Sequence, residues 1–293
     1  MHDHGHGTDL SLGQAIVLLP FAAAAIIYVA AAVAESGKGR PWPWWRTLCW
    51  MLGLAVAALV MTGTTSVAPD RPFTDHAVGH LLIGMVAPLL LVQAAPVTLA
   101  LRSFARLPAR RLSRVLRSAP ARLLGHPATA GVLSVGSLWL LYTTPLHSVT
   151  AEPFLHRVVL LHFLAAGFLF TAVIAPVDPS PHRAPLIVRL VVLALALAAH
   201  GVLMKALYAS ASGGTGVLAD LMRVDDVSRL DLQTGAQIMF YGGDLVDLVL
   251  IALVLWGWYR ASGRRAVTAR RRVRPEQQPA RVLTATALPE GAT

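Results

Sequence analysis

Histidines recur at helical spacing inside apolar stretches of this chain, where ionisable side chains are rare. His76 and His80 are four residues apart, so they share one helix face and lie about 6 Å apart along its axis. An ionisable residue within a membrane span is a candidate for function by default. This pair is therefore the starting point for any chemistry the chain performs.

Two later apolar segments carry polar groups at comparable depth. Glu152 and His156 are again four residues apart, and His162 follows roughly 9 Å deeper along the same helix. His200 and Met204 form another pair on one helix face. The sequence predicts that these side chains gather in one half of the membrane.

A mixed set of this kind favours copper. Asp231 and Met239 add a carboxylate and a thioether near the start of the last apolar segment. Imidazole suits copper, zinc and iron, whereas thioether sulfur favours Cu(I). The set expected to hold Cu(I) is His76, His80, His156, His162, His200, Met204 and Asp231.

Simpler interpretations exist for the same residues. A single histidine within a membrane often links helices by a hydrogen bond, and methionine often fills gaps in a core. Asp244 and Asp247 lie deep in the last apolar segment, where they could form a polar path or bond to a neighbouring helix. The spacing alone leaves these alternatives open.

The composition identifies the elements that must position these residues. Of the 293 residues 55% are hydrophobic and 14% are charged, against about 25% charged in soluble domains. The single cysteine, Cys49, excludes an intramolecular disulfide. The net charge of +10 belongs to segments that flank apolar runs, so a lipid bilayer is the expected partner and nucleic acid is not.

Seven runs are long enough to cross a bilayer, which takes about 20 apolar residues. The predicted fold is therefore all-α, a polytopic membrane bundle of seven transmembrane helices. The expected spans are Leu12 to Val33, Leu48 to Val67, His76 to Leu101, Ala128 to Leu146, Phe154 to Pro176, Leu186 to Tyr208 and Gly235 to Tyr259.

Basic residues predict the orientation of the bundle. Alternate loops and the C-terminal segment hold 20 of the 25 Lys and Arg residues, and such loops stay in the cytoplasm. The N-terminus is expected outside and the C-terminus inside. Three parts follow: a His-rich outer tail over residues 1–11, a membrane domain over 12–260, and a basic, disordered cytoplasmic tail over 261–293.

The order of motifs resembles the multi-spanning CtaG family of cytochrome c oxidase assembly factors. The resemblance covers about residues 12 to 260. It rests on His76-Ala-Val-Gly-His80, Met85-Val-Ala-Pro88, His126-Pro127, Pro153-Phe-Leu-His156, Leu161-His162-Phe163, Pro176-Val-Asp178-Pro179, His200, Leu207-Tyr208 and Asp231 with Gly235 and Met239.

The resemblance implies a non-enzymatic role in the bacterial plasma membrane. The chain would deliver copper to, or hold it for, the catalytic subunit of cytochrome c oxidase on the outer side. Two rivals remain. A haem-binding electron carrier would use two histidines as axial ligands, and a copper or proton-coupled transporter would use Asp244 and Asp247.

Overall fold

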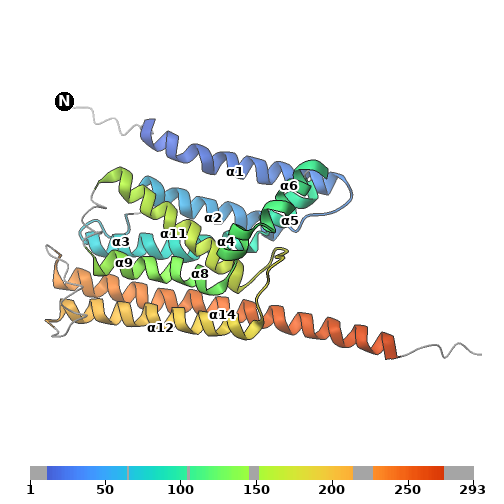
Figure 1. Cartoon of the computed structure of the whole chain (residues 1–293). Coiled ribbons are helices and arrows are strands. Elements are labelled where there is room, and N and C mark those ends of the chain that lie inside the picture. The colour runs from blue at the N-terminus through green and yellow to red at the C-terminus, as the bar shows by residue number, and fades with distance from the viewer. Residues whose placement is uncertain (1–11, 65, 104–105, 145–151, 214–226, 274–293) are drawn as a thin grey trace, which may run out of the picture. The chain divides into compact units, whose positions relative to one another are not determined.

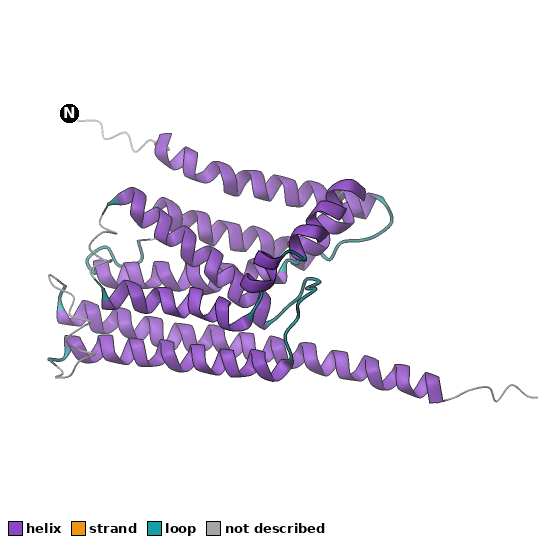
Figure 2. Ribbon diagram, in the orientation of Figure 1, coloured by secondary structure: helices purple, strands orange, loops and turns teal. Residues whose placement is uncertain are grey.

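The computed structural model describes residues 12–64, 66–103, 106–144, 152–213 and 227–273, and every element within these ranges is a helix (Figure 2). The all-helical prediction is thereby confirmed. The histidine-rich tail over residues 1–11 lies outside the described residues. Residues up to Val254 form one compact unit, and a second unit begins at Leu255.

The first two helices, α1 (Leu12–Gly37) and α2 (Trp44–Thr62), pack side by side (Figure 1). The Tyr28 ring stacks on Trp50 with centroids 4.8 Å apart. Its hydroxyl donates to the Ala94 carbonyl at 2.7 Å and accepts from Trp42 Nε1 at 3.1 Å. One tyrosine thus ties α1 to two later segments.

The third apolar run is interrupted. It comprises α3 (Pro72–Leu81), a π-helical turn η1 (Leu82–Val86), α4 (Ala87–Gln93) and α5 (Pro96–Ser103). Ala95 has φ 53°, and its left-handed conformation ends α4 before α5 starts. Pro96 lacks a backbone N–H and so suits the first position of the new helix.

Short helices follow on the basic segment. They are α6 (Arg106–Leu116) and α7 (Ala119–Leu124). The next run is continuous through α8 (Pro127–Gly131), the π-helical η2 (Val132–Gly136) and α9 (Ser137–Thr143). Trp139 Nε1 donates to the Ala199 carbonyl at 3.1 Å and so links α9 to the helix that carries His200.

Three long helices complete the described chain: α11 (Pro153–Ile174), α12 (Leu186–Ala211) and α14 (Arg229–Val273). Within the first unit, α3, α11 and α14 begin at the end of the bundle where α9 and α12 finish (Figure 1). The expected tail over 261–293 starts inside α14, which continues to Val273. Its Arg and Ala residues favour a helix.

Six helical stretches are long and apolar enough to cross a membrane, and they include the stretch from Pro72 to Ser103 despite its break at Ala95. The chain is therefore a multi-pass membrane protein. The fourth expected span, Ala128 to Leu146, is not among the six. Its described helices have 5, 5 and 7 residues. The run ends at Thr143, because Thr144 leaves the helical conformation, and residues 145 and 146 lie outside the described ranges. The seventh span and the orientation remain predictions.

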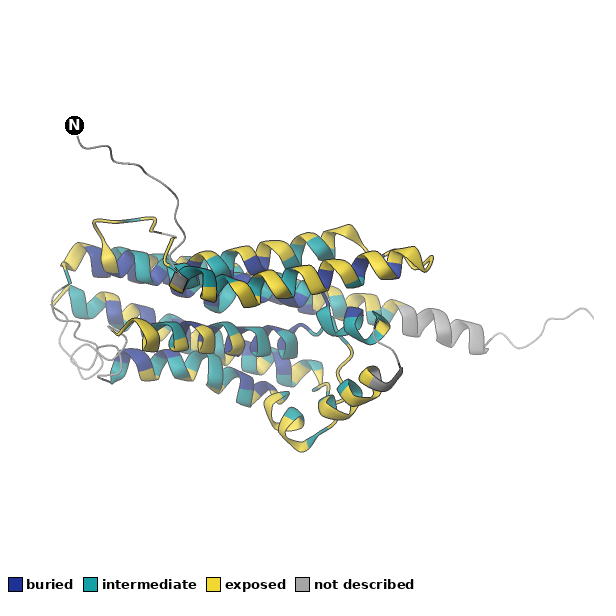
Figure 3. Ribbon diagram, turned by 90° about the horizontal axis from the view of Figure 1, so that it is seen from above, coloured by how far each residue is buried: buried dark blue, intermediate teal, exposed yellow. Residues whose placement is uncertain are grey.

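Buried side chains follow the inner faces of these helices, and exposed ones cover the outer faces (Figure 3). The largest core cluster includes Phe73, Tyr142, Phe163, Leu203 and Met239. A second cluster, around Phe170, Ile174 and Leu193, continues the core along the same bundle.

A carboxylate from a distant loop caps α5. Asp178 accepts the backbone N–H groups of Val97 at 3.1 Å and Thr98 at 2.7 Å, and also the Thr98 hydroxyl. The first N–H groups of a helix have no partner within it, and a negative charge there also suits the helix dipole. Asp178 therefore fixes α5 against the loop that follows α11.

Asp178→Ala is expected to loosen α5 and to lower stability by about 1–2 kcal/mol, the usual cost of losing a helix cap. Hydrogen exchange at the amides of Val97 and Thr98 measures the effect directly. Asp70→Ala, at an exposed position, is the matched control. Equal protection of both amides in the two variants would show that the cap contributes nothing.

Candidate metal site

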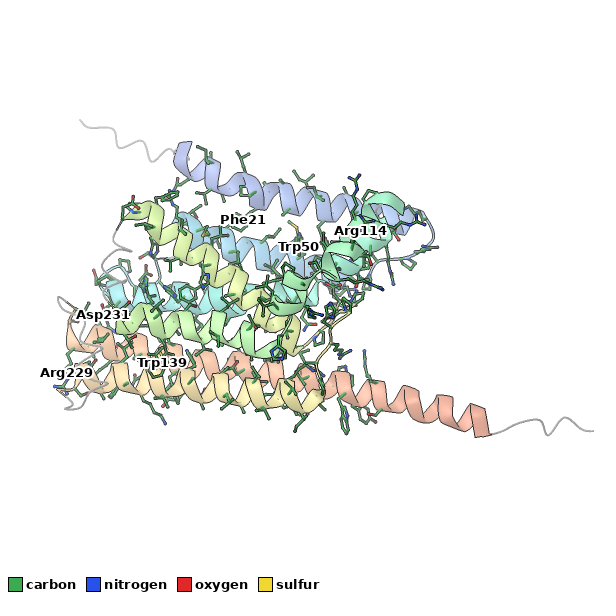
Figure 4. All side chains as sticks on the ribbon, in the orientation of Figure 1. Phe21, Trp50, Arg114, Trp139, Arg229 and Asp231 are labelled. Atoms are coloured by element: carbon green, nitrogen blue, oxygen red, sulfur yellow. The ribbon has the colours of Figure 1, made fainter. Side chains whose placement is uncertain are left out.

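A second carboxylate holds the start of the helix that carries His76 and His80. Asp231, at the beginning of α14, accepts the N–H groups of Phe73 at 2.9 Å and Thr74 at 2.8 Å. The Thr74 hydroxyl donates to the Asp231 carbonyl at 3.2 Å. Asp231 is buried, and Figure 4 places it at the end of the bundle where α14 begins. It therefore fixes α3 and α14 relative to each other.

Glycines then set how closely the helices approach. A Cβ on Gly235 would lie 2.6 Å from the Phe73 ring, and one on Gly242 would overlap the Leu81 side chain. α3 and α14 thus run in the same direction in close contact. A Cβ on Gly243 would lie 2.5 Å from His200 Cε1, so the imidazole rests on the α14 backbone.

Three histidines of α3 and α11 meet. The His76 and His80 ring centroids are 4.3 Å apart, and the His76 and His156 centroids are 5.6 Å apart. His80 is buried, whereas His76 and His156 are partly exposed. We call His76, His80 and His156 the histidine cluster.

His80 also lines an interior chamber of about 70 Å³ within the bundle. Its polar and sulfur-bearing lining residues come from α3, η1, η2, α11, α12 and α14, and they are His80, Met85, Ser134, Thr171, His200, Met239 and Asp247. The chamber extends the polar character of the cluster into the bundle.

The other predicted ligands lie outside the cluster. His162 is exposed and lines a different, apolar groove beside Trp50 and Leu91. His200 lines the interior chamber. Met204 is fully buried in the main core cluster, and both carboxylate oxygens of Asp231 accept backbone N–H groups.

The described residues contain no group of three or more His, Cys, Asp or Glu side chains arranged to hold a metal ion. The rings of the histidine cluster would have to turn to face one ion. Partial exposure of His76 and His156 leaves room for that rotation. Imidazole nitrogens in this arrangement suit a borderline or soft cation such as copper.

Three chamber residues with thioether or carboxylate side chains were left out of the ligand set expected from the sequence, namely Met85, Met239 and Asp247. The spacing of residues in the sequence indicated two of them. Met239, Gly243 and Asp247 follow one another at four-residue spacing, which places them on one face of a helix.

The sequence profile of a family described as cytochrome c oxidase caa3 assembly factor (Caa3_CtaG) matches residues 26–261. An uncharacterized protein of Mycobacterium leprae is 30% identical over 237 residues, which is 76% of this chain and 35% of that protein. Uncharacterized proteins of Mycobacterium bovis and Mycobacterium tuberculosis are each 37% identical over 150 residues, 48% of this chain and 22% of theirs.

This chain thus spans about a third or less of the length of these curated relatives. No solved structure matches it significantly.

Proposed function

Because this chain belongs to the cytochrome c oxidase caa3 assembly factor family, we propose that it binds Cu(I) at the histidine cluster and passes it to the oxidase catalytic subunit. The role is non-catalytic, with copper as cargo. The proposed location is the bacterial plasma membrane, with the cluster at the outer surface and the C-terminus in the cytoplasm.

The observation that carries this proposal is the meeting of His76, His80 and His156. Two separate helices contribute them. The ring centroids of His76 and His80 are 4.3 Å apart, and those of His76 and His156 are 5.6 Å apart. Nε2 of His80 has no hydrogen-bond partner among the described residues, although it is buried. Such an atom is costly unless a ligand or water satisfies it.

The geometry also suits a carrier that must release its cargo. His80 is held inside the bundle, in contact with the Phe163 ring at 4.6 Å, whereas His76 and His156 are partly exposed. One fixed donor and two accessible donors allow a partner protein to replace ligands one at a time. The buried His80 fixes where the ion binds, and the partly exposed His76 and His156 allow the ion to be exchanged.

Alanine at His76, His80 or His156 is expected to lower Cu(I) affinity at least about tenfold, since even outer-shell substitutions at metal sites cost 10–100-fold. Competition of the purified protein with a chromophoric Cu(I) chelator measures the affinity. In cells that rely on the variant, oxidase activity and oxidase copper content are expected to fall together.

Two variants serve as controls. His126→Asn keeps the side-chain acceptor at the start of α8, where His126 Nδ1 accepts from the Ala128 N–H at 3.3 Å. His162→Ala removes an imidazole from the separate groove. Both should bind Cu(I) normally. Unchanged affinity in all three cluster variants, with copper-replete oxidase, would contradict the proposal.

Copper or proton-coupled transport is the second candidate, favoured by one observation: Asp247 lines the interior chamber deep in α14. Sealed vesicles containing the protein distinguish the two roles. Copper flux that Asp247→Asn abolishes would indicate transport, whereas an oxidase defect without flux would indicate assembly.

The interior chamber gives less support to the haem alternative. Its volume is about 70 Å³, well below the roughly 300 Å³ at which small-molecule pockets begin. His80 and His200 both line it, but a porphyrin between them would require the surrounding helices to separate.

A further inference from the structure

The interior chamber contains a second imidazole nitrogen that lacks a partner. Nδ1 of His200 and Nε2 of His80 both have no hydrogen-bond partner among the described residues. The exposed fractions of the two residues are 6% and 4%. Both residues line the interior chamber, and buried polar atoms in native proteins are almost always paired, so each of these nitrogens is a candidate ligand atom.

The two imidazoles lie at the same level of the bundle. Leu81, next to His80, packs against Gly242, and the His200 ring packs against Gly243. Gly242 and Gly243 are consecutive in α14, so these contacts differ in height by about 1.5 Å. His80 and His200 therefore approach the chamber from two helices at nearly one depth.

Sulfur and oxygen donors lie about one turn away. Met239 and Asp247 are four residues before and after Gly243, which is about 6 Å in each direction along α14. Met85 contributes a second thioether from the π-helical turn η1. Neutral imidazole and thioether suit Cu(I).

The charge of the chamber favours a cation. Among the residues that line it, Asp247 is the one acid, and none is Lys or Arg. A buried carboxylate is costly unless it is paired. A cation bound in the chamber would offset the charge of this carboxylate.

We propose that the interior chamber is a second binding position for Cu(I), formed by His80 and His200 with Met85 or Met239 and balanced by Asp247. This inference rests on the proposed function for the identity of the cargo. His80 belongs to both positions, so the ion moves between the histidine cluster and the chamber by exchanging the other ligands around His80. No electron is transferred and copper stays Cu(I).

Sulfur distinguishes the two positions, because the histidine cluster contains only imidazole. The test uses X-ray absorption of the full chain loaded with Cu(I), with His2, His4 and His6 changed to Gln in every protein compared. We expect the His76→Ala/His156→Ala variant to retain Cu(I) and to show copper–sulfur scattering. Adding Met85→Leu and Met239→Leu should remove that signal, and adding His200→Gln should weaken binding at least about tenfold.

Met61→Leu is the matched control, since Met61 packs against the same core but does not line the chamber. Methionine-to-leucine changes conserve volume and cost less than about 1.5 kcal/mol, so the variants should remain folded. Nitrogen-only scattering in the parent protein, with no Cu(I) held by the His76→Ala/His156→Ala variant, would overturn the chamber site and leave the cluster proposal intact. A parent protein that binds no Cu(I) would overturn both.

Discussion

Gly167→Ala is expected to be among the most disruptive single-methyl additions in this protein. Gly167 lies where α11 crosses η1 and α4. A Cβ there would overlap the Gly84 carbonyl oxygen and lie 2.9 Å from Pro88 Cγ. Neither neighbour is the end of a flexible side chain. The helices would have to separate, at or above the roughly 3 kcal/mol upper end of usual overpacking costs.

Separation of α11 from η1 and α4 would also alter the interior chamber. Gly84, Gly167 and Phe163 line the interior chamber together with His80. Thermal unfolding in detergent and Cu(I) affinity should therefore fall together in Gly167→Ala. Gly257→Ala is the control, because a Cβ there meets nothing within 4 Å and alanine favours a helix by about 0.5–1 kcal/mol. Equal stability of the two variants would show that the crossing is not as tight as described.

Asp231→Ala is expected to have a comparably large effect for a different reason. The substitution leaves two buried N–H groups, those of Phe73 and Thr74, without their acceptor. Each orphaned group costs about 1–3 kcal/mol, so the free energy of unfolding should fall by about 3 kcal/mol or more. Asp231→Asn keeps one acceptor oxygen and should recover part of the loss.

Asp75→Ala, on α3, provides the comparison. Asp75 also accepts two backbone N–H groups, from Val67 and Ala68, but it is partly exposed, so water can replace it. A smaller loss is expected there. If Asp231 were instead held mainly by a metal ion, Asp231→Ala would lose Cu(I) affinity without losing stability in the metal-free protein. Chemical denaturation of the metal-free protein separates the two roles.

Hydropathy was sufficient to locate most of the helices but not to describe the break within the third run. The apolar residues around Leu89 and Leu91 are continuous with those of α5. The break depends on the positive φ of Ala95, which alanine rarely adopts. Asp178, 81 residues from Val97, stabilises the helix that follows, and no local pattern indicates such a contact.

The ligand set was predicted from the depth of each residue along its helix. The direction in which each residue points around the helix explains why His162 lies outside the histidine cluster. His156 and His162 are six residues apart, which at about 100° per residue puts them about 120° apart around α11. His156 therefore reaches the histidine cluster while His162 lines the groove beside Trp50. This separation was available from the sequence.

The position of Met85 in the interior chamber could not be predicted from the sequence. In an α-helix a residue five positions after His80 points about 140° away from it. The π-helical turn η1 widens the spiral between them, and both side chains line the chamber. The residue types around Met85 do not indicate a π turn.

The paired glycines of α14 have a mechanical consequence. Leu81 on α3 and the His200 ring on α12 both bear on adjacent backbone positions, Gly242 and Gly243, with no side chain between. A rotation of α14 about its own axis would therefore displace Leu81 on α3 and His200 on α12 at the same time. The positions of Leu81 and His200, on two different helices, therefore both depend on where the α14 backbone lies at these two residues.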